Sequence, residues 1–279
     1  MTEEARTPEW YNLQAKELIY NENRSTSTLS GNVLLRGATV TMGAEKIEID
    51  HDRRIATADK NVFIRGKKFS LEGGKVEATF PDGVFEITEH AAVTVTSDKE
   101  KPTKLHAGRI EYFEDENKPI LFSGHVFAED ENKKANAVGG SLDRSKNTLK
   151  LAGAVRVIFP PGEGQKLLKE ETRKGLANPE TQKTIQAETR LACDQFTINT
   201  KTHDAEGGGS VWVSQVGKSA RSDYVTYDHE KETLHLSGNV EIQKEGDWLK
   251  TEYVDVSIQD ETFTAGEKVE ARFQFKVDE

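Results

Sequence analysis

The sequence is dominated by an internal repeat of about 29 residues, which occurs eight times along the chain. The segment SGNVLLRG at 30–37 returns as SGNVEIQK at 237–244, and weaker copies lie between them. A valine marks each copy, and successive markers are separated by 29, 31, 33, 29, 56, 29 and 29 residues. These valines are Val33, Val62, Val93, Val126, Val155, Val211, Val240 and Val269. The chain is therefore an array of one short structural unit.

A second, independent register supports the first. Eighteen residues before most marker valines lies a small side chain: Ala15, Ala44, Ala137, Cys193, Ser222 or Thr251. In the other two repeats the small residue, Ala107 or Gly73, precedes the marker by nineteen and twenty residues. Two side chains, mostly apolar, follow the small residue at the third and fifth positions, as Ile47 and Ile49 follow Ala44. Chance would not preserve both registers through eight copies.

The spacing of apolar residues within a repeat has a period of two, which is typical of a β-strand. Val62 and Ile64 share one face, for example, while Phe63 points to the other. Turns rich in Asp, Asn and Gly separate the strands, such as DHDRR at 50–54 and DHEKE at 228–232. Each repeat is therefore predicted to be two antiparallel strands of roughly ten residues.

Small residues in the middle of these strands predict a bend. Five repeats carry a glycine two residues before the marker valine, and glycine inside a strand usually marks a bend or a bulge. Folding the hairpin at 44–64 brings Ala44 close to Asp59 and Lys60, so the small positions of neighbouring strands line up as a crease. The predicted fold is all-β, with about sixteen bent antiparallel strands in two sheets that are hinged along one edge and turn their apolar faces toward each other.

Residues 158–188 interrupt the pattern between the fifth and sixth repeats. They separate residues 10–157, with repeats one to five, from residues 189–279, with repeats six to eight, although strand pairing can run straight across. Good helix formers at 165–177 lie between PPG at 160–162 and Asn178-Pro179, which predicts a loop with one short helix. The segment is either a tolerated surface insertion or an element that docks a partner or covers a groove.

Composition fits a sheet with one buried and one solvated face, because 35% of the residues are hydrophobic and 31% are charged. A net charge of −10 argues against nucleic acid or an anionic membrane surface as the main partner. No apolar run approaches the length of a membrane span. The first residues, MTEEARTP, lack the basic and apolar regions of a secretory signal. The chain is therefore either cytoplasmic or has lost its targeting segment.

No residue pattern argues for catalysis, a metal site or a cofactor. The seven histidines lack metal-ligand spacing, and Asp50-His51-Asp52 and Asp228-His229-Glu230 occupy a turn where solvated polar residues are expected. Cys193 stands at the small position of its repeat, which favours a buried thiol over a nucleophile. There is no P-loop and no G-x-S-x-G motif. The chain is predicted not to be an enzyme.

The repeats from Ala15 to Val33 and from Ala44 to Val62 resemble the OstA-like repeat of lipopolysaccharide-transport proteins, namely LptA, LptC and the N-terminal part of LptD. The likeness covers the chain apart from residues 1–9 and the insertion. It implies an elongated V-shaped β-jellyroll, also called a β-taco, in which lipopolysaccharide acyl chains lie between the sheets. It also implies a periplasmic bridge between the inner and outer membranes, and leaves open whether the chain acts as LptA or as LptC does.

The resemblance implies lipopolysaccharide or a related lipid as ligand. The partners would be other Lpt-type β-jellyroll proteins or a second copy of this chain, joined by edge-strand addition. The residues predicted to line the groove share one strand face across the repeats. They are Ile47, Ile49, Val62, Ile64, Ile110, Val126, Phe196, Ile198, Val211, Val213, Val225, Tyr227, Val240 and Ile242.

Two other interpretations remain open. A stacked-β structural or interaction protein would have the same strands with a packed interior and no ligand. A carbohydrate-active enzyme on a β-solenoid would need carboxylates or basic residues clustered on one sheet face, whereas Asp and Glu here concentrate in the turns.

Overall fold

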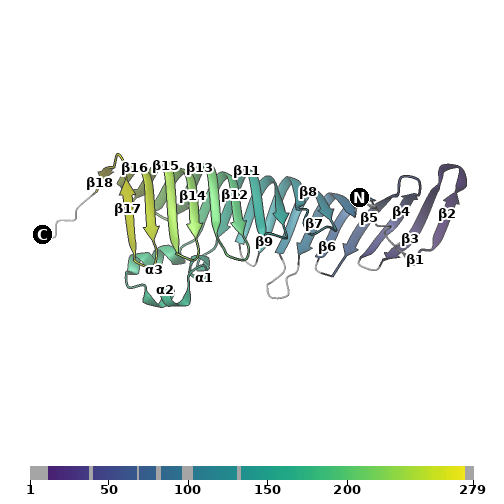
Figure 1. The fold of residues 1–279 in the computed structure, drawn as a ribbon, viewed down its shortest axis with the longest axis horizontal. Coiled ribbons are helices and arrows are strands. Elements are labelled where there is room, and N and C mark those ends of the chain that lie inside the picture. Colours follow the sequence, from purple (N-terminus) through teal and green to yellow (C-terminus); the bar gives the residue numbers. More distant parts are fainter. Residues whose placement is uncertain are drawn as a thin grey trace, which may run out of the picture. The chain divides into compact units, whose positions relative to one another are not determined.

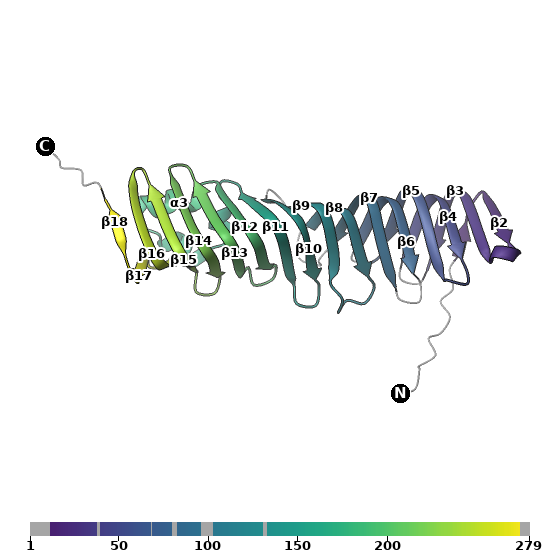
Figure 2. The ribbon, with the colours of Figure 1, turned by 90° about the horizontal axis from the view of Figure 1, so that it is seen from above.

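The computed structural model describes residues 12–37, 40–67, 69–79, 83–95, 103–130 and 133–273 (Figure 1). Eighteen strands belong to one antiparallel sheet, and the all-β prediction is confirmed. The chain divides into two compact units, Met1–Gly124 and His125–Glu279. Within each unit, consecutive strands lie side by side and pair with their neighbours in sequence (Figures 1 and 2).

The first unit contains a short 3₁₀ turn, Glu22–Arg24, and these strands: β1 (Asn12–Gln14), β2 (Glu17–Asn21), β3 (Thr26–Arg36), β4 (Thr41–Asp50), β5 (Ile55–Arg65), β6 (Phe69–Thr79), β7 (Val84–Val95) and β8 (Thr103–Phe113). Strand β9 (Ile120–Asp130) crosses the boundary between the units.

The second unit contains the remaining elements: β10 (Lys133–Asp143), β11 (Thr148–Phe159), α1 (Glu163–Lys166), α2 (Glu170–Gly175), α3 (Pro179–Gln186), β12 (Thr189–Asn199), β13 (Ala205–Gln215), β14 (Lys218–Asp228), β15 (Thr233–Lys244), β16 (Asp247–Ser257), β17 (Thr262–Gly266) and β18 (Glu270–Arg272). No helix among the described residues is long and apolar enough to cross a membrane.

The predicted crease exists, and a β-bulge forms it in each repeat. In β3, Ser30 pairs with Lys46 and Val33 with Ala44, so that Gly31 and Asn32 together oppose one residue of β4. Both bulge residues have positive φ, +81° at Gly31 and +54° at Asn32. The same pair of positive-φ residues recurs in the middle of β5, β7, β9, β11, β13 and β15 and just after β17, and it bends the chain at each of these places.

The bulges also correct the marker of the third repeat. Glu89 and His90 form the positive-φ pair there, so the residue equivalent to Val33 and Val62 is Ala91 and not Val93. Gly73 then precedes its marker by eighteen residues, as in most other repeats. Val93 has the pattern of a marker because it also lies on the buried face and is larger than Ala91.

Folding at the crease explains how a single sheet buries one face. In the first unit, Ile47 lies on one side of the crease in β4 and Met42 on the other, and both are buried. In the second unit the same holds in β15 for Leu236 and Val240. Residues on both sides of the bend can leave water only because the two halves of the sheet fold together, apolar face to apolar face.

The strand count differs from the predicted sixteen because two strands are divided. The first is split into β1 and β2, which both pair with β3. The last is split into β17 and β18, which both pair with β16 on either side of the bulge at Glu267 and Lys268. The last strand is described only as far as Phe273, and residues 1–11 also lie outside the described part.

The insertion forms three short helices where one was predicted. Asn178 and Pro179 were interpreted as the end of a helix, but they begin α3. The Asn178 side chain accepts a hydrogen bond from the Glu180 backbone, and Pro179 occupies the first helical turn. Both signals are typical of a helix start. The preceding helix, α2, has already ended, with Leu176 as its C-cap.

The crease can be tested at Gly238, whose φ is +75°. A Cβ there would lie 2.5 Å from Asp223 Oδ2. Replacing Gly238 with Ala is expected to lower the free energy of unfolding by about 1–2 kcal/mol, because a side chain is strained in the left-handed region. Urea unfolding followed by circular dichroism measures the change.

The matched control is Lys60→Gly, because Lys60 holds the same bulge position in β5 with φ +65°. Glycine relieves the strain there and is expected to leave the unfolding free energy unchanged or higher. A loss equal to that of Gly238→Ala would show that strain at the bulge does not control the fold.

Candidate functional site

The fourteen residues predicted to line a groove all lie on the inner face of the folded sheet, and none is exposed. Nine are buried, and Ile49, Ile198, Val213, Tyr227 and Ile242 are half-buried. Each of them is therefore withdrawn from solvent within its own unit. It holds no ligand, so lipid contact at these positions stays a prediction.

The interior of the first unit is filled by the chain's own side chains. Ile47, Ile64 and Ile110 have no exposed surface, and Val62 has 2%. Phe69 and Tyr112 stack with their ring centroids 4.2 Å apart, which adds an aromatic contact to the aliphatic core. In this unit the two halves of the sheet are closely packed.

The interior of the second unit is less covered toward the strand ends. Val211 and Val240, beside the crease, are 1% exposed, whereas Val213 and Ile242, two residues further along the same strands, are half-buried. Tyr227 near the opposite strand ends is also half-buried. Four of the five half-buried candidates belong to this unit, so its inner face is the more accessible of the two.

The turns of the second unit form two rims, one at each end of its bent strands. Rim A comprises the turns at 144–147, 200–204, 229–232 and 258–261. Rim B comprises the turns at 216–217 and 245–246 and the base of the insertion, residues 160–188, between β11 and β12. The helices α1 to α3 lie along the strand ends of this unit (Figure 1).

A buried carboxylate on rim A holds the far side of the insertion. Glu232 is 1% exposed; one of its oxygens accepts a hydrogen bond from the Lys169 backbone, and the other accepts one from Thr172 Oγ1. The Glu261 carboxylate accepts a bond from the Asn178 backbone at 3.0 Å. A buried carboxylate is costly unless it is fully hydrogen-bonded, so these bonds fix the place of α2.

Tyr227 joins the inner face of the sheet to the insertion. Its side chain lies on the inner face with Val225, and its hydroxyl donates a hydrogen bond to the Leu167 carbonyl at 3.1 Å. Burial raises the pKa of Tyr227 to about 12, and the negative charges of Glu232, Asp204 and Asp228 add to the effect. The phenol is therefore a neutral donor at ordinary pH.

Cys193 is a buried free thiol beside the crease of the second unit. Burial, and secondarily the charge of Asp194, raises its pKa to about 11. A thiol with that pKa is almost wholly protonated at neutral pH and is a poor nucleophile. The structure thus agrees with a packing role.

Asp50-His51-Asp52 and Asp228-His229-Glu230 lie in turns, as predicted, and their first aspartates stabilise those turns. Asp50 Oδ1 accepts hydrogen bonds from the backbones of Asp52 and Arg53, and Asp228 Oδ1 accepts one from Lys231. Among the residues that the structure describes, no group of three or more His, Cys, Asp or Glu side chains could hold a metal ion.

Glu232, Thr172 and Lys169 are the contact residues that sequence reasoning missed. Glu232 ends the turn DHEKE, which reads as a solvated surface turn, and its partners lie 60 and 63 residues away. The one available signal was inside the insertion, where Leu168 and Leu176 interrupt a polar segment and are both buried.

Comparison with solved structures found LptH from Pseudomonas aeruginosa, described as the LptA homologous periplasmic component of the conserved lipopolysaccharide transport device. It has 13% sequence identity and a TM-score of 0.28, and the match covers 52% of this chain and 82% of that chain. No curated protein matches the chain in sequence.

The family model described as "Lipopolysaccharide-assembly, LptC-related" matches the chain twice, at residues 2–96 and 90–245. The two matches together span more than half of the sequence. Proteins of this family are periplasmic transport components and not enzymes. Their partners are lipopolysaccharide and other Lpt proteins. The chain belongs to the LptC-related family of lipopolysaccharide-assembly proteins.

Proposed function

We propose that this protein forms part of the periplasmic bridge for lipopolysaccharide or a related lipid, and that the inner face of its folded sheet shields the acyl chains. The observation that carries the proposal is the inner face itself: fourteen residues that share one strand face across the repeats are all withdrawn from water. The half-buried residues of the second unit mark where chains enter between the layers.

The energetics favour acyl chains as the bound part of the ligand. Each buried methylene contributes about 0.8 kcal/mol, so a few chains provide ample affinity. The net charge of −10 repels the phosphates and acidic sugars of such a lipid, which keeps its headgroup in water outside the groove.

Photo-crosslinking tests the assignment of faces. A crosslinking amino acid at Ile49 or Val240, on the inner face, is expected to capture lipid in cells that make lipopolysaccharide. The same amino acid at the adjacent Glu48 or Glu241 is expected not to, because neighbouring residues of a strand point to opposite faces. Mass spectrometry of the adducts identifies the lipid.

Equal capture from both faces would reject the face assignment. Absence of lipid at Ile49 and Val240 alike would favour the alternative of a stacked-β structural protein with a packed interior.

We also propose that the chain joins its neighbours by edge-strand addition. At the N-terminal edge, Leu18, Ile19 and Tyr20 are more than half exposed, and the register of β2 pairs it with β3. At the C-terminal edge, β18 pairs with β16, and Val269 and Phe273 beside it are exposed. A strand at the edge of a sheet offers its outer backbone donors and acceptors as a template for another chain.

Proline at the C-terminal edge tests this mode of assembly. Ala271→Pro is expected to weaken association with a second copy or a related jellyroll protein at least tenfold, because proline cannot donate to a new strand partner. Surface plasmon resonance measures the affinity, and circular dichroism checks the fold.

The matched control is Val216→Pro. Val216 is 95% exposed in the two-residue turn after β13, and the next residue, Gly217, has φ +75°. A type II turn has this glycine at its second central position and favours proline at the first. If Ala271→Pro associates as tightly as Val216→Pro, edge-strand addition at this end is wrong.

A further inference from the structure

The insertion leaves the sheet without disturbing it. Phe159 and Thr189, the residues on either side of it, still pair with each other as β11 and β12 end at rim B. The described strand pairs contain no residue from 160–188, so the insertion is an appendage of one hairpin. The Gly162 backbone donates to the Gln186 carbonyl at 2.9 Å and closes the base of this appendage.

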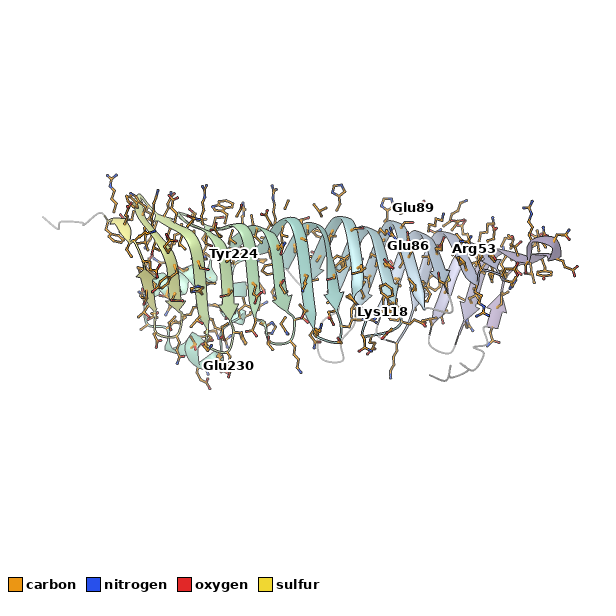
Figure 3. The ribbon with its side chains drawn as sticks, turned by 45° about the horizontal axis from the view of Figure 1, so that its top comes forward. Arg53, Glu86, Glu89, Lys118, Tyr224 and Glu230 are labelled. Atoms are coloured by element: carbon orange, nitrogen blue, oxygen red, sulfur yellow. The ribbon has the colours of Figure 1, made fainter. Side chains whose placement is uncertain are left out.

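From rim B the insertion reaches across to rim A. Besides the bonds of Glu232 and Glu261, Lys169 Nζ donates to the Glu230 carbonyl at 2.6 Å. Figure 3 places Glu230 at the edge of the second unit beside the helices, and Tyr224 near the opposite, creased edge. The helices therefore lie at the open side of the folded sheet and not at its crease.

The C-terminal part of the insertion, in α3, is bonded to rim B. Gln215 Nε2 donates to the Thr184 carbonyl at 2.9 Å, and Lys218 Nζ donates to Thr184 Oγ1 at 2.7 Å. Lys244 pairs with Glu180 at 3.5 Å. One segment thus holds both rims of the groove, over β13 to β16.

Side chains of the insertion face the protein at this crossing. Leu168 and Leu176 are each 6% exposed, although the helices that carry or flank them have polar outer surfaces. The bond from Tyr227 to Leu167 connects this segment directly to an inner-face residue. The segment lies over the part of the groove where Val213, Tyr227 and Ile242 are only half-buried.

We propose that residues 160–188 are a lid over the groove mouth of the second unit, which opens to let acyl chains pass sideways into or out of the groove. The proposal rests on the proposed function and adds a gate to it. Closed, the lid occupies the mouth; open, it uncovers the half-buried inner face toward the strand ends.

The bonding of the insertion suits a movable element. Its polar ties to the rims are hydrogen bonds and ion pairs, which water can replace, and no strand pairing has to break for it to lift. Gly162, with φ +85°, stands at its base, where a glycine permits a change of backbone direction. The Glu232 cluster is the latch, because that carboxylate is buried only while α2 is in place.

The first experiment needs no lipid. Ile242→Cys in a Cys193→Ala background supplies one thiol beneath the lid, and its reaction with a water-soluble maleimide reports opening. Thr172→Val removes one donor to Glu232 and is expected to raise the labelling rate at least fivefold. Thr181→Val, in α3 and away from Glu232, is the matched control and is expected to leave the rate unchanged.

The second experiment locks the lid. Asn178→Cys with Glu261→Cys, again in the Cys193→Ala background, is joined by a short bis-maleimide across rim A. Locking is expected to reduce photo-crosslinking of lipopolysaccharide at Ile242 at least tenfold, and to leave capture at Ile49 in the first unit unchanged. The same double variant without the reagent is the control.

A third variant separates a lid from a strap that holds the sheet closed. Replacing residues 160–188 with Asn-Gly gives a two-residue hairpin turn between Phe159 and Thr189. A lid predicts faster labelling and faster lipid capture at Ile242, with the circular dichroism of the sheet retained. Lost capture at Ile242 in this folded variant would identify a strap and overturn the proposal.

The outcomes also distinguish the lid from the proposed function. Labelling of Ile242→Cys that is the same with and without Thr172→Val and with the insertion deleted overturns the lid, whatever the lipid data show. Lid-dependent labelling with no lipid captured at Ile49 or Ile242 in any variant overturns the proposed function and keeps the gate.

Discussion

The whole structure depends on one backbone constraint, the pair of positive-φ residues in the middle of alternate strands. An antiparallel sheet of this length would otherwise leave one face of alternating apolar residues in water. The bulge bends the strand that carries it, and because the repeats within each unit place it at the same register, the bends line up as a crease. Burial of the inner face then follows from the geometry of single strands and needs no second layer of helices or strands.

The two-residue bulge is costly wherever it is not glycine. Lys60 and Asn61, Glu89 and His90, and Glu267 and Lys268 all occupy the left-handed region. Hydrogen bonds across the crease offset part of this strain: Asn61 Nδ2 donates to Glu45, and Asn239 Nδ2 donates to Asp223. The outer side of the crease is therefore polar, with side-chain hydrogen bonds between neighbouring strands. The backbone strain is distributed over many equivalent positions.

Structural features that repeat along the chain could be predicted from the sequence, and features that occur only once could not. Strand registers, the crease and the inner face could be predicted, because eight copies average out local exceptions such as Ala91, where the larger Val93 misled the alignment of the third repeat. The insertion has no second copy to compare with. Its three helices depend on capping at Asn178 and on contacts such as Thr172 with Glu232, which join residues 60 positions apart and leave no periodic signal.

The pairing of Phe159 with Thr189 shows how such a fold can diversify. Twenty-nine residues separate these partners, and yet the strands on either side continue as if a tight turn joined them. A turn at either rim can in this sense accept an inserted segment without a shift in the register of any strand. A protein built in this way can therefore keep its sheet unchanged and acquire different inserted segments, each at a position set by the hairpin that carries it.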